Sequence, residues 1–516
     1  MAETSPTVFP LVAKPGVKRD GTQLEGNSYI DSLWCRFQRG LPRKMGGWGE
    51  MSDSISGPVR GCFVWSQAGL NYIYAGSSGS LEYITADADG AASSTVDYTP
   101  TGLAASANNV WQFDGLWNAG GANTALIAHG APNLLQIDSD TATAVYYGPI
   151  DGTGSMVTTT KSVSGGCVAL HPYLFLYGSN GQILWSDANS PTNWTTGDAG
   201  SARVVATKIV KGLALRGGPS NSPAGLFWSL DSVLRASFVG GSAIFRFDTI
   251  TNQTSVLSSS GMIEYDGLFF WPGVDRFYVY NGVVQELQND YNVNYFFDNL
   301  NWTYRQKVWA TKVPRFGEIW FFYPHGDSVE CNNALIYNIR EKVWYDAGLD
   351  SPGAARTAGY FSQVFRYPVW FGVTASDVDK YQAMQHEFGV DAVIGGTGNA
   401  VHSYFETPDI SFLTQGPMQS QHLGQDIQTA MFRIEPDFVQ TGDMTLTYRG
   451  RAFPRSTDQD ASETFSPTTR KLDPREQRRF LRFKFEGNVE GGDYQMGMPL
   501  LHLRPGDVRP SGPDST

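Results

Sequence analysis

The sequence has 516 residues, of which 41% are hydrophobic, 17% charged and 13% aromatic, and its formal net charge is −12. A chain of this length can form roughly two to four domains or one large repeat architecture. The composition excludes a disordered polyelectrolyte, and no apolar run approaches the roughly 20 residues that would span a bilayer. The net negative charge disfavours non-specific nucleic-acid binding, because lysine and arginine provide the affinity for phosphate.

The N-terminal segment has no basic region followed by an apolar core, so we predict no secretory signal peptide and expect synthesis in a cytoplasm. Charge is distributed unevenly beyond this segment. Residues 1–45 carry seven Lys/Arg and four Asp/Glu, and residues 430–516 carry thirteen of each. With a total of −12, residues 46–429 therefore carry −15, and the acidity lies in the middle of the chain.

A hairpin pattern recurs six times through that middle: an apolar strand, a short turn and a second apolar strand. The copies span residues 72–84, 125–137, 174–186, 225–236, 268–280 and 319–337. Their turns, at Gly76, Gly130, Gly178, Ser229, Gly273 and Pro324, follow one another at 44 to 54 residues, a spacing typical of one four-stranded antiparallel blade per repeat. We predict an all-β fold with a β-propeller of about six blades; the alternative is a large β-sandwich.

The rhythm changes beyond Gly372, where residues 382–398 are polar and rich in glycine, and we interpret this change as a boundary. Residues 430–434, 444–449 and 480–485 then alternate with period two, and their polar positions are often arginine. This pattern predicts an antiparallel sheet with one apolar and one cationic face. We divide the chain into an N-terminal arm (1–57), a propeller with loop insertions (58–405) and an antiparallel β platform (406–516), to which the arm contributes.

No residue pattern indicates catalysis, a metal or a cofactor. The four cysteines lie far apart and form no CxxC pair, so buried free thiols are expected, and the seven histidines form no HxH or HExxH group. Residues 186–194 resemble the Asp-box turn of sialidases once, without its usual glycine, and we interpret them as a blade turn. No spacing proposes the paired carboxylates of a glycosidase. We predict a structural, non-enzymatic protein.

Both ends of the chain resemble the tail nozzle, or packaged-DNA stabilisation, proteins of short-tailed, podovirus-like bacteriophages. At the N-terminus the resemblance is carried by Pro15-Gly16-Val17, Asp20-Gly21-Thr22, Tyr29-Ile30-Asp31, Arg36-Phe37 and residues 40–48. At the C-terminus it is carried by Arg475, Arg478-Arg479-Phe480, Arg482-Phe483, Gly497-Met498-Pro499-Leu500 and Gly506-Asp507-Val508-Arg509. Residues 320–344 are similar to a late blade of the same proteins. A related tail protein of another phage class or of a gene transfer agent is the alternative.

The resemblance implies a ring, commonly of six subunits, that docks below the adaptor and portal, encloses the DNA channel, retains packaged DNA and gates its ejection. Its partners would be further copies of itself, the adaptor and through it the portal, tail fibres or a tail needle, and the double-stranded DNA that passes without sequence-specific binding. The host's outer surface would be a further partner. The protein would reside in the virion tail after synthesis in the host bacterial cytoplasm. An acidic wall would repel phosphate and let a duplex slide.

Docking residues are predicted where basic side chains cluster near the ends of the chain. The candidates for ion pairs with the adaptor or a neighbouring subunit are Arg475, Arg478, Arg479, Arg482, Arg43 and Lys44. The alternative for the C-terminal group is a solvated sheet face. A receptor- or glycan-binding tail protein is the second hypothesis, because Trp271, Tyr278 and Tyr280 could stack on sugars unless they are buried. A propeller enzyme is the third.

Overall fold

The computed structural model describes residues 6–51, 54–67, 70–87, 90–93, 95–99, 110–119, 123–131, 145–149, 155–157, 163–216, 222–374, 377–411 and 427–507. Nearly all regular structure among them is β. The one α-helix of this part of the chain is α1 (Val293–Asn299), and short 3-10 helices cover Ser179–Gly181, Gly241–Ala243, Trp302–Lys307 and Pro352–Ala354. No helix in the described ranges is long and apolar enough to cross a membrane.

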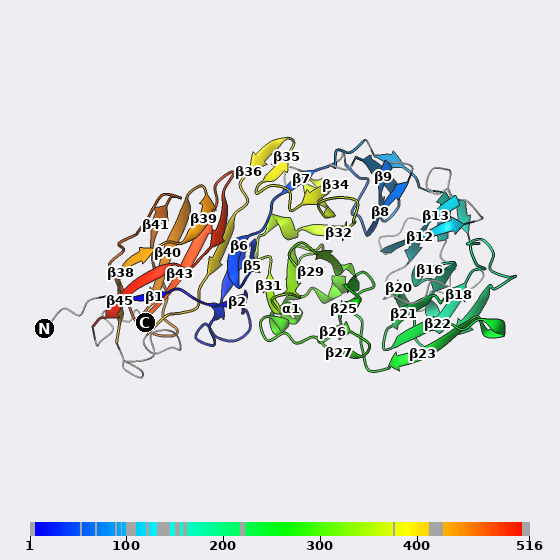
Figure 1. The fold of residues 1–516 in the computed structure, drawn as a ribbon, viewed down its shortest axis with the longest axis horizontal. Helices are drawn as coiled ribbons and strands as arrows, with labels where there is room; N and C mark the ends of the chain where they lie inside the picture. Colours follow the sequence, from blue (N-terminus) through cyan, green and yellow to red (C-terminus); the bar gives the residue numbers. More distant parts are fainter. Residues whose placement is uncertain are drawn as a thin grey trace.

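Six four-stranded antiparallel sheets follow one another along the chain, each built from consecutive strands (Figure 1). The first three are β8–β11 (Gly61–Gln67, Leu70–Gly76, Leu81–Ala86, Val96–Asp97), β12–β15 (Val110–Ala119, Asn123–Ala131, Val145–Pro149, Ser155–Val157) and β16–β19 (Gly166–Leu170, Tyr173–Tyr177, Gln182–Trp185, Gly200–Arg203). The next three are β20–β23 (Ile209–Ala214, Ala224–Ser229, Val233–Phe238, Phe245–Thr251), β24–β27 (Ile263–Tyr265, Leu268–Pro272, Phe277–Tyr280, Val284–Glu286) and β28–β31 (Trp309–Val313, Glu318–Tyr323, Asn333–Asn338, Val343–Asp346).

The predicted hairpins are the second and third strands of these sheets. All six residues of β29 are buried, as expected for a central strand covered on both faces. One detail differs in the second sheet: β13 pairs with β14 at residues 145–149, whereas the second strand predicted at 134–137 lies outside the described residues. The all-β fold with repeated four-stranded antiparallel sheets is confirmed.

A seventh sheet follows, which the hairpin spacing did not predict. It contains β32 (Arg356–Tyr360), β33 (Val369–Thr374) and β34 (Asp377–His386), then β7 (Trp48–Glu50), β35 (Ala392–Ile394) and β36 (Thr397–Asn399). The expected change at Gly372 is therefore not the end of the blades, because β34 continues the sheet through polar residues. Its next strand, β7, comes from the N-terminal segment and pairs antiparallel with β34.

The first strands of most neighbouring sheets lie side by side. Contacts join β8 to β12, β12 to β16, β16 to β20, β24 to β28, β28 to β32 and β32 to β8. Figure 1 shows the seven sheets grouped on the right of the molecule in this propeller-like arrangement. Six sheets are those that the hairpins predicted, and the seventh depends on a strand from far upstream.

Strands from the two ends of the chain pair in three further sheets, which we call the terminal sheets (left in Figure 1). In sheet order they are β4 (Asp31–Leu33), β37 (Ser403–Glu406), β43 (Phe480–Gly487), β40 (Met444–Arg451), β41 (Gln459–Phe465); β39 (Phe438–Thr441), β44 (Asp493–Met496), β6 (Leu41–Lys44), β5 (Cys35–Gln38); and β1 (Thr7–Pro10), β45 (Leu500–Pro505), β38 (Thr429–Glu435), β42 (Glu476–Arg478). A parallel pair, β2 (Lys14–Val17) and β3 (Ser28–Tyr29), lies between them and the propeller-like sheets.

One hydrophobic core joins the terminal sheets to the last propeller-like sheets. Trp34 and Phe485 from the terminal side belong to the same buried cluster as Trp320 and Trp370, and none of the four is more than 1% exposed. The Trp34 ring lies 5.8 Å from that of Trp320 in an edge-on arrangement. Burial of four such side chains stabilises the junction by several kcal/mol, at about 25 cal/mol per Å² of apolar area.

Candidate functional site

The N-terminal motif residues form the junction between the terminal sheets and the propeller-like sheets. β2 contacts β31, and Gly16 in β2 has a φ of +98° with a position for a Cβ only 2.6 Å from the Tyr291 ring. Asp20 accepts hydrogen bonds from the backbone amides of Asn294 and Tyr295 (2.9 and 2.8 Å) at the start of α1. Two positions of the motif therefore have a physical reason: Gly16 lies where the backbones approach closely, and Asp20 is a carboxylate where helix amides need an acceptor.

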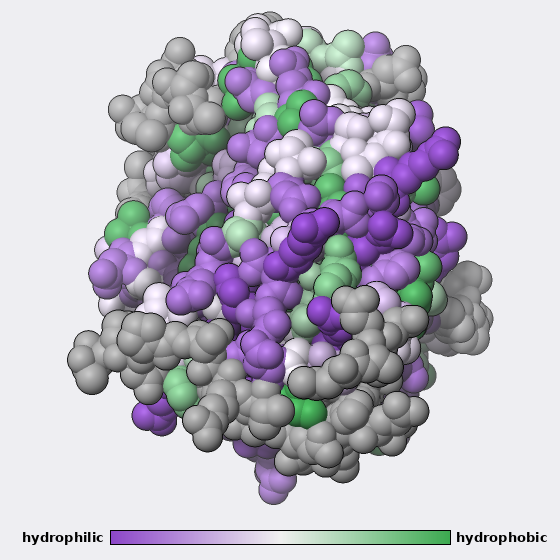
Figure 2. Space-filling view, turned by 90° about the vertical axis from the view of Figure 1, so that its left-hand side faces the viewer, coloured by the Kyte–Doolittle hydropathy of each residue, from purple (hydrophilic) through white to green (hydrophobic). Residues whose placement is uncertain are grey.

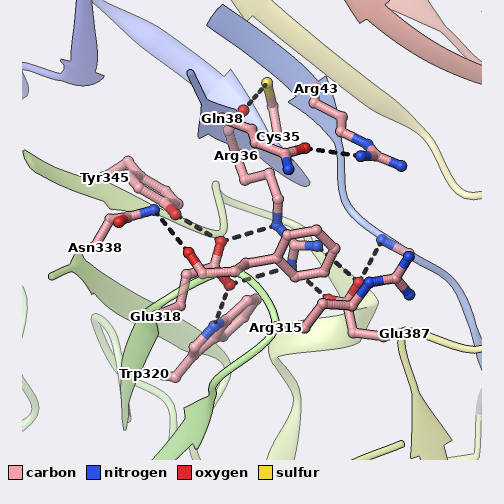
Figure 3. A network of polar contacts seen from close by, with 12 residues as sticks. Cys35, Arg36, Gln38, Arg43, Arg315, Glu318, Trp320, Asn338, Tyr345 and Glu387 are labelled. Atoms are coloured by element: carbon pink, nitrogen blue, oxygen red, sulfur yellow. Dashed lines mark hydrogen bonds and ion pairs between the residues drawn. The ribbon is translucent and has the colours of Figure 1, made fainter. Parts of the chain in front are cut away.

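Arg36 is the centre of a buried charge network at this junction (Figure 3). Its Nε and Nη2 donate to the two carboxylate oxygens of Glu318 at 2.8 and 3.1 Å, and Nη1 donates to Glu387 Oε2 at 2.7 Å. Trp320 Nε1 and Tyr345 Oη donate to the same Glu318 carboxylate at 2.9 and 2.6 Å. Arg36 and Glu318 are 1% and 0% exposed, so this network fixes strand β5 against strand β29 without solvent.

The electrostatics of the network are set by burial. Burial, followed by the charge of Glu387, raises the pKa of Glu318 even though Arg36 opposes the rise. Burial disfavours the charge of Arg36, but the two glutamates outweigh it and hold the pKa of the guanidinium above its ordinary value. The Phe316 ring centroid lies 3.8 Å from Arg36 Cζ and covers one face of the guanidinium.

A second buried arginine lies nearby without a carboxylate. Arg356 Nε donates to His386 Nε2 at 2.8 Å, and its Nη1 donates to two backbone carbonyls. Burial lowers the pKa of Arg356 to about 9, and burial followed by the charge of Arg356 lowers the pKa of His386 well below its ordinary value. His386 stacks on Trp370 with 3.9 Å between ring centroids. A neutral imidazole accepts the hydrogen bond of Arg356 in a site walled by tryptophan.

The predicted docking arginines do not form one exposed cationic face. Arg482 is 3% exposed, forms ion pairs with Glu406 and Asp458, and donates through Nη1 to Gln23 Oε1 at 2.8 Å. Arg482 was predicted to dock to a partner, and this needs correction, because its guanidinium is buried among side chains of the same chain. Neighbouring Arg449 is likewise paired with Glu406, at 2.9 Å. The polar face predicted to be cationic is a mixed ion network.

The other residues predicted to dock differ in how exposed their side chains are, from exposed Arg475 to buried Lys44. Arg475 is exposed, and Arg478 and Arg479 are half-buried beside it at β42, which is an edge strand of its sheet. Arg478 forms an ion pair with Glu476 at 2.8 Å, and Arg479 donates to the carbonyl of Ala452 at 3.1 Å. These three residues lie together.

Arg43 and Lys44 lie apart from that group, on β6. Arg43 is half-buried and donates to Gln38 at 2.7 Å. Lys44 is 3% exposed and donates to the Gly492 carbonyl at 2.6 Å, and burial lowers the pKa of its ammonium. Lys44 therefore ties β6 to the residue that precedes β44, and the docking role predicted for it does not fit its burial.

The junction residues Glu318, Glu387, Arg356 and His386 were not predicted as functional. A signal existed for one of them: Glu318 is a lone carboxylate immediately before the apolar run 319–323, where only a paired charge is tolerated. The aromatic residues considered for glycan stacking, Trp271, Tyr278 and Tyr280, are at most 9% exposed. They are blade core residues, which removes the observation behind the glycan-binding hypothesis.

The described residues contain no group of three or more His, Cys, Asp or Glu side chains arranged to hold a metal ion. All four cysteines are free thiols, and three are fully buried. The sialidase-like segment lies between β18 and β19, and its Asp187 accepts a hydrogen bond at 2.9 Å from the backbone amide of Asp198, which follows the segment. A cavity of about 610 Å³ lies at the axis of the propeller-like sheets and is lined by their first strands.

No family model and no curated protein matches the chain. Among solved structures it is similar to an exo-β-1,3-galactanase from Phanerochaete chrysosporium, with 10% identity, a TM-score of 0.31, and coverage of 89% of this chain and 99% of that one. BBS1N in complex with ARL6DN gives 10% identity, a TM-score of 0.40 and coverage of 66% and 97%. A chain of the Mitotic Checkpoint Complex has 13% identity and a TM-score of 0.37, with coverage of 75% of this chain and 96% of that one. At these values the similarities carry no functional argument, and the architecture rests on the strand pairing described above.

Proposed function

We propose that this chain is a structural, non-enzymatic subunit of the tail nozzle ring of a short-tailed bacteriophage. In this proposal about six copies surround the DNA channel below the adaptor and portal, retain packaged DNA and gate its ejection. The protein resides in the virion tail. Fibres or a tail needle attach to the ring, and the duplex passes through it without sequence-specific contacts.

The observation that supports the proposal most is the meeting of the two family-like ends. Within the terminal sheets, β6 of the N-terminal segment pairs directly with β44 of the C-terminal segment, and β4 is joined to β43 through β37. Two segments at opposite ends of a sequence are expected to resemble the same family when they fold together as one unit. Their contact in the terminal sheets supports the proposal that both segments belong to one platform attached to a propeller-like body.

The outer end of the terminal sheets suits docking through polar contacts. Figure 2 faces this end, and hydrophilic residues cover most of its coloured surface, with apolar residues in small separate patches. Strands β39 and β41 contribute exposed residues in alternation. We propose Arg475, Arg478 and Arg479 on the edge at β42 as the docking residues. Charge-assisted pairs to carboxylates of the adaptor or a neighbouring subunit would give the contact its orientation.

Assembly provides the direct experiment. The purified chain should form, with its adaptor, a six-fold ring with an open axis in negative-stain images. A solitary particle without an axial hole, under conditions that preserve the tail of the virion, would contradict the proposal. Trimers that bind cells or oligosaccharides without the adaptor would favour a receptor-binding tail protein.

Docking is tested by the double variant Arg478→Glu/Arg479→Glu. We expect heads that package DNA but lose it, because reversed charges repel the carboxylates of the partner. The measurements are DNA content per particle and infectious titre. The matched control is Arg235→Glu/Arg246→Glu, two exposed arginines on the propeller-like sheets, which should leave both unchanged. Full, infectious particles from the first variant would remove the docking role.

A further inference from the structure

The axial cavity of the propeller-like sheets has a chemically distinct end. The cavity is lined by the first strands β8, β12, β16, β20, β28 and β32 and by residues of β24. Its charged lining residues include Asp114 in the middle of β12, Lys211 in β20, Arg216 just beyond β20, Glu264 in β24 and Lys312 near the end of β28. The remaining charged lining residues, Arg60 and Lys307, precede their strands, and both pair with Glu330 at 2.6 to 2.7 Å.

The carboxylates at this end are satisfied by the chain itself. Asp114 accepts from the backbone amides of Gly115 and Ala169, each at 2.8 Å. Glu264 accepts from the Gly267 amide at 2.8 Å and forms an ion pair with Lys312 at 3.2 Å. All four carboxylate oxygens therefore have a donor.

The cations Lys211 and Arg216 are not satisfied in this way. Neither donates a hydrogen bond or forms an ion pair within the part of the chain that the structure describes. Lys211 follows a register shift in β20, and such bulges redirect side chains. Lys211 and Arg216 line the same cavity as Asp114, and their charges oppose the rise that burial produces in the pKa of Asp114. Three ammonium and five guanidinium N–H donors remain for a ligand.

We propose that this end of the cavity binds the oxyanion group of a small ligand, a phosphate or a carboxylate, through Lys211 and Arg216. Each carboxylate oxygen of Asp114 and Glu264 already accepts one hydrogen bond, whereas Lys211 and Arg216 donate none within the described residues, so the free donors of this site fit an anion. A guanidinium can contact two oxygens of either group at once. The volume of about 610 Å³ lies within the range of small-molecule pockets, roughly 300–1,000 Å³. The inference does not depend on the tail nozzle assignment.

Calorimetric titration of the full chain tests the site, with inorganic phosphate and glucuronate as separate probes in a buffer low in chloride. Saturable binding of either probe is the expected result, and its identity separates the phosphate from the carboxylate source. Lys211→Met/Arg216→Gln should weaken that binding at least tenfold. The control Arg246→Gln/Arg276→Gln, in exposed side chains outside the cavity, should leave it unchanged.

Folding of the cavity variant is checked by its melting temperature without ligand, which should stay at or above the original value because two unpaired cations are removed. Failure of both probes to bind the unaltered chain would overturn the proposal. Equal binding by the cavity variant and the unaltered chain would also overturn it.

Discussion

The propeller-like sheets and the terminal sheets differ in how far apart in sequence their paired strands lie. Each of the first six propeller-like sheets is made of consecutive strands, and charge pairs such as Arg246–Asp248 join exposed neighbours along the chain. The terminal sheets pair strands from opposite ends, and their junction depends on the buried Arg36–Glu318 pair, 282 residues apart in sequence. Stability is therefore spread over many similar local units in one region and concentrated in a few long-range contacts in the other.

The largest effect is expected where the long-range contacts are cut. Glu318→Ala leaves Arg36 buried with half of its acceptors removed, and it should lower the free energy of unfolding by about 3–5 kcal/mol. Denaturant unfolding followed by tryptophan fluorescence measures the change. The exposed pair variant Arg276→Ala should have no measurable effect. If both variants unfold alike, the junction does not differ from the propeller-like surface as we describe.

A gain of stability is expected in the propeller-like region from Lys208→Met. Lys208 is 2% exposed, its Nζ has no described partner, and burial lowers its pKa to about 8. The variant should be more stable by about 2–3 kcal/mol at pH 7. Between pH 8 and its ordinary pKa the unfolded chain binds more protons than the folded chain, so the original protein gains stability as pH rises.

The advantage of Lys208→Met should therefore shrink from pH 8 to pH 10.5, as measured by unfolding at fixed pH values. The exposed Lys342→Met is a suitable control, since its side chain lies in solvent and should show no such dependence. An advantage that stays constant with pH would contradict the account of Lys208.

Two glycine substitutions test the close approach of backbones at the junction, and the difference expected between them, about 1 kcal/mol, is the smallest of these effects. Gly16→Ala must adopt a φ of +98° and place its Cβ against Tyr291, so a loss of about 2–3 kcal/mol is expected. Gly241→Ala, in the 3-10 helix between β22 and β23, has a φ of +67° but nothing within 4 Å, so only conformational strain of about 1–2 kcal/mol is expected. Thermal unfolding of the two variants gives the difference, and equal losses would show that the contact is irrelevant.

Prediction from sequence succeeded where the signal is local. An apolar run, a turn and another apolar run identify a hairpin without knowledge of the rest of the chain, and six sheets were found in this way. The seventh sheet was missed because β34 has a polar sequence and its neighbour β7 is supplied from far upstream. Local spacing carries no information about that pairing.

The candidate site was predicted less well for the same physical reason. The alternation of residues 480–485 predicts that Arg482 lies on the polar face of its strand. It does not predict that Gln23, Glu406 and Asp458, which are distant in sequence, bury its guanidinium there. Arg36 was part of the recognised motif, yet its partners Glu318 and Glu387 are separated from it by most of the propeller-like region. An arginine in a sequence does not reveal whether its counter-ions belong to the same chain.

The position of β7 also orders events during synthesis. Glu50 leaves the ribosome early, but its partner Met384 follows only after all six earlier sheets have been made. At roughly 5–20 residues per second, this strand waits on the order of tens of seconds before it can pair. Residues 48–50 should therefore be accessible to protease in nascent chains truncated before β34. The last sheet is completed only after β34 has been translated.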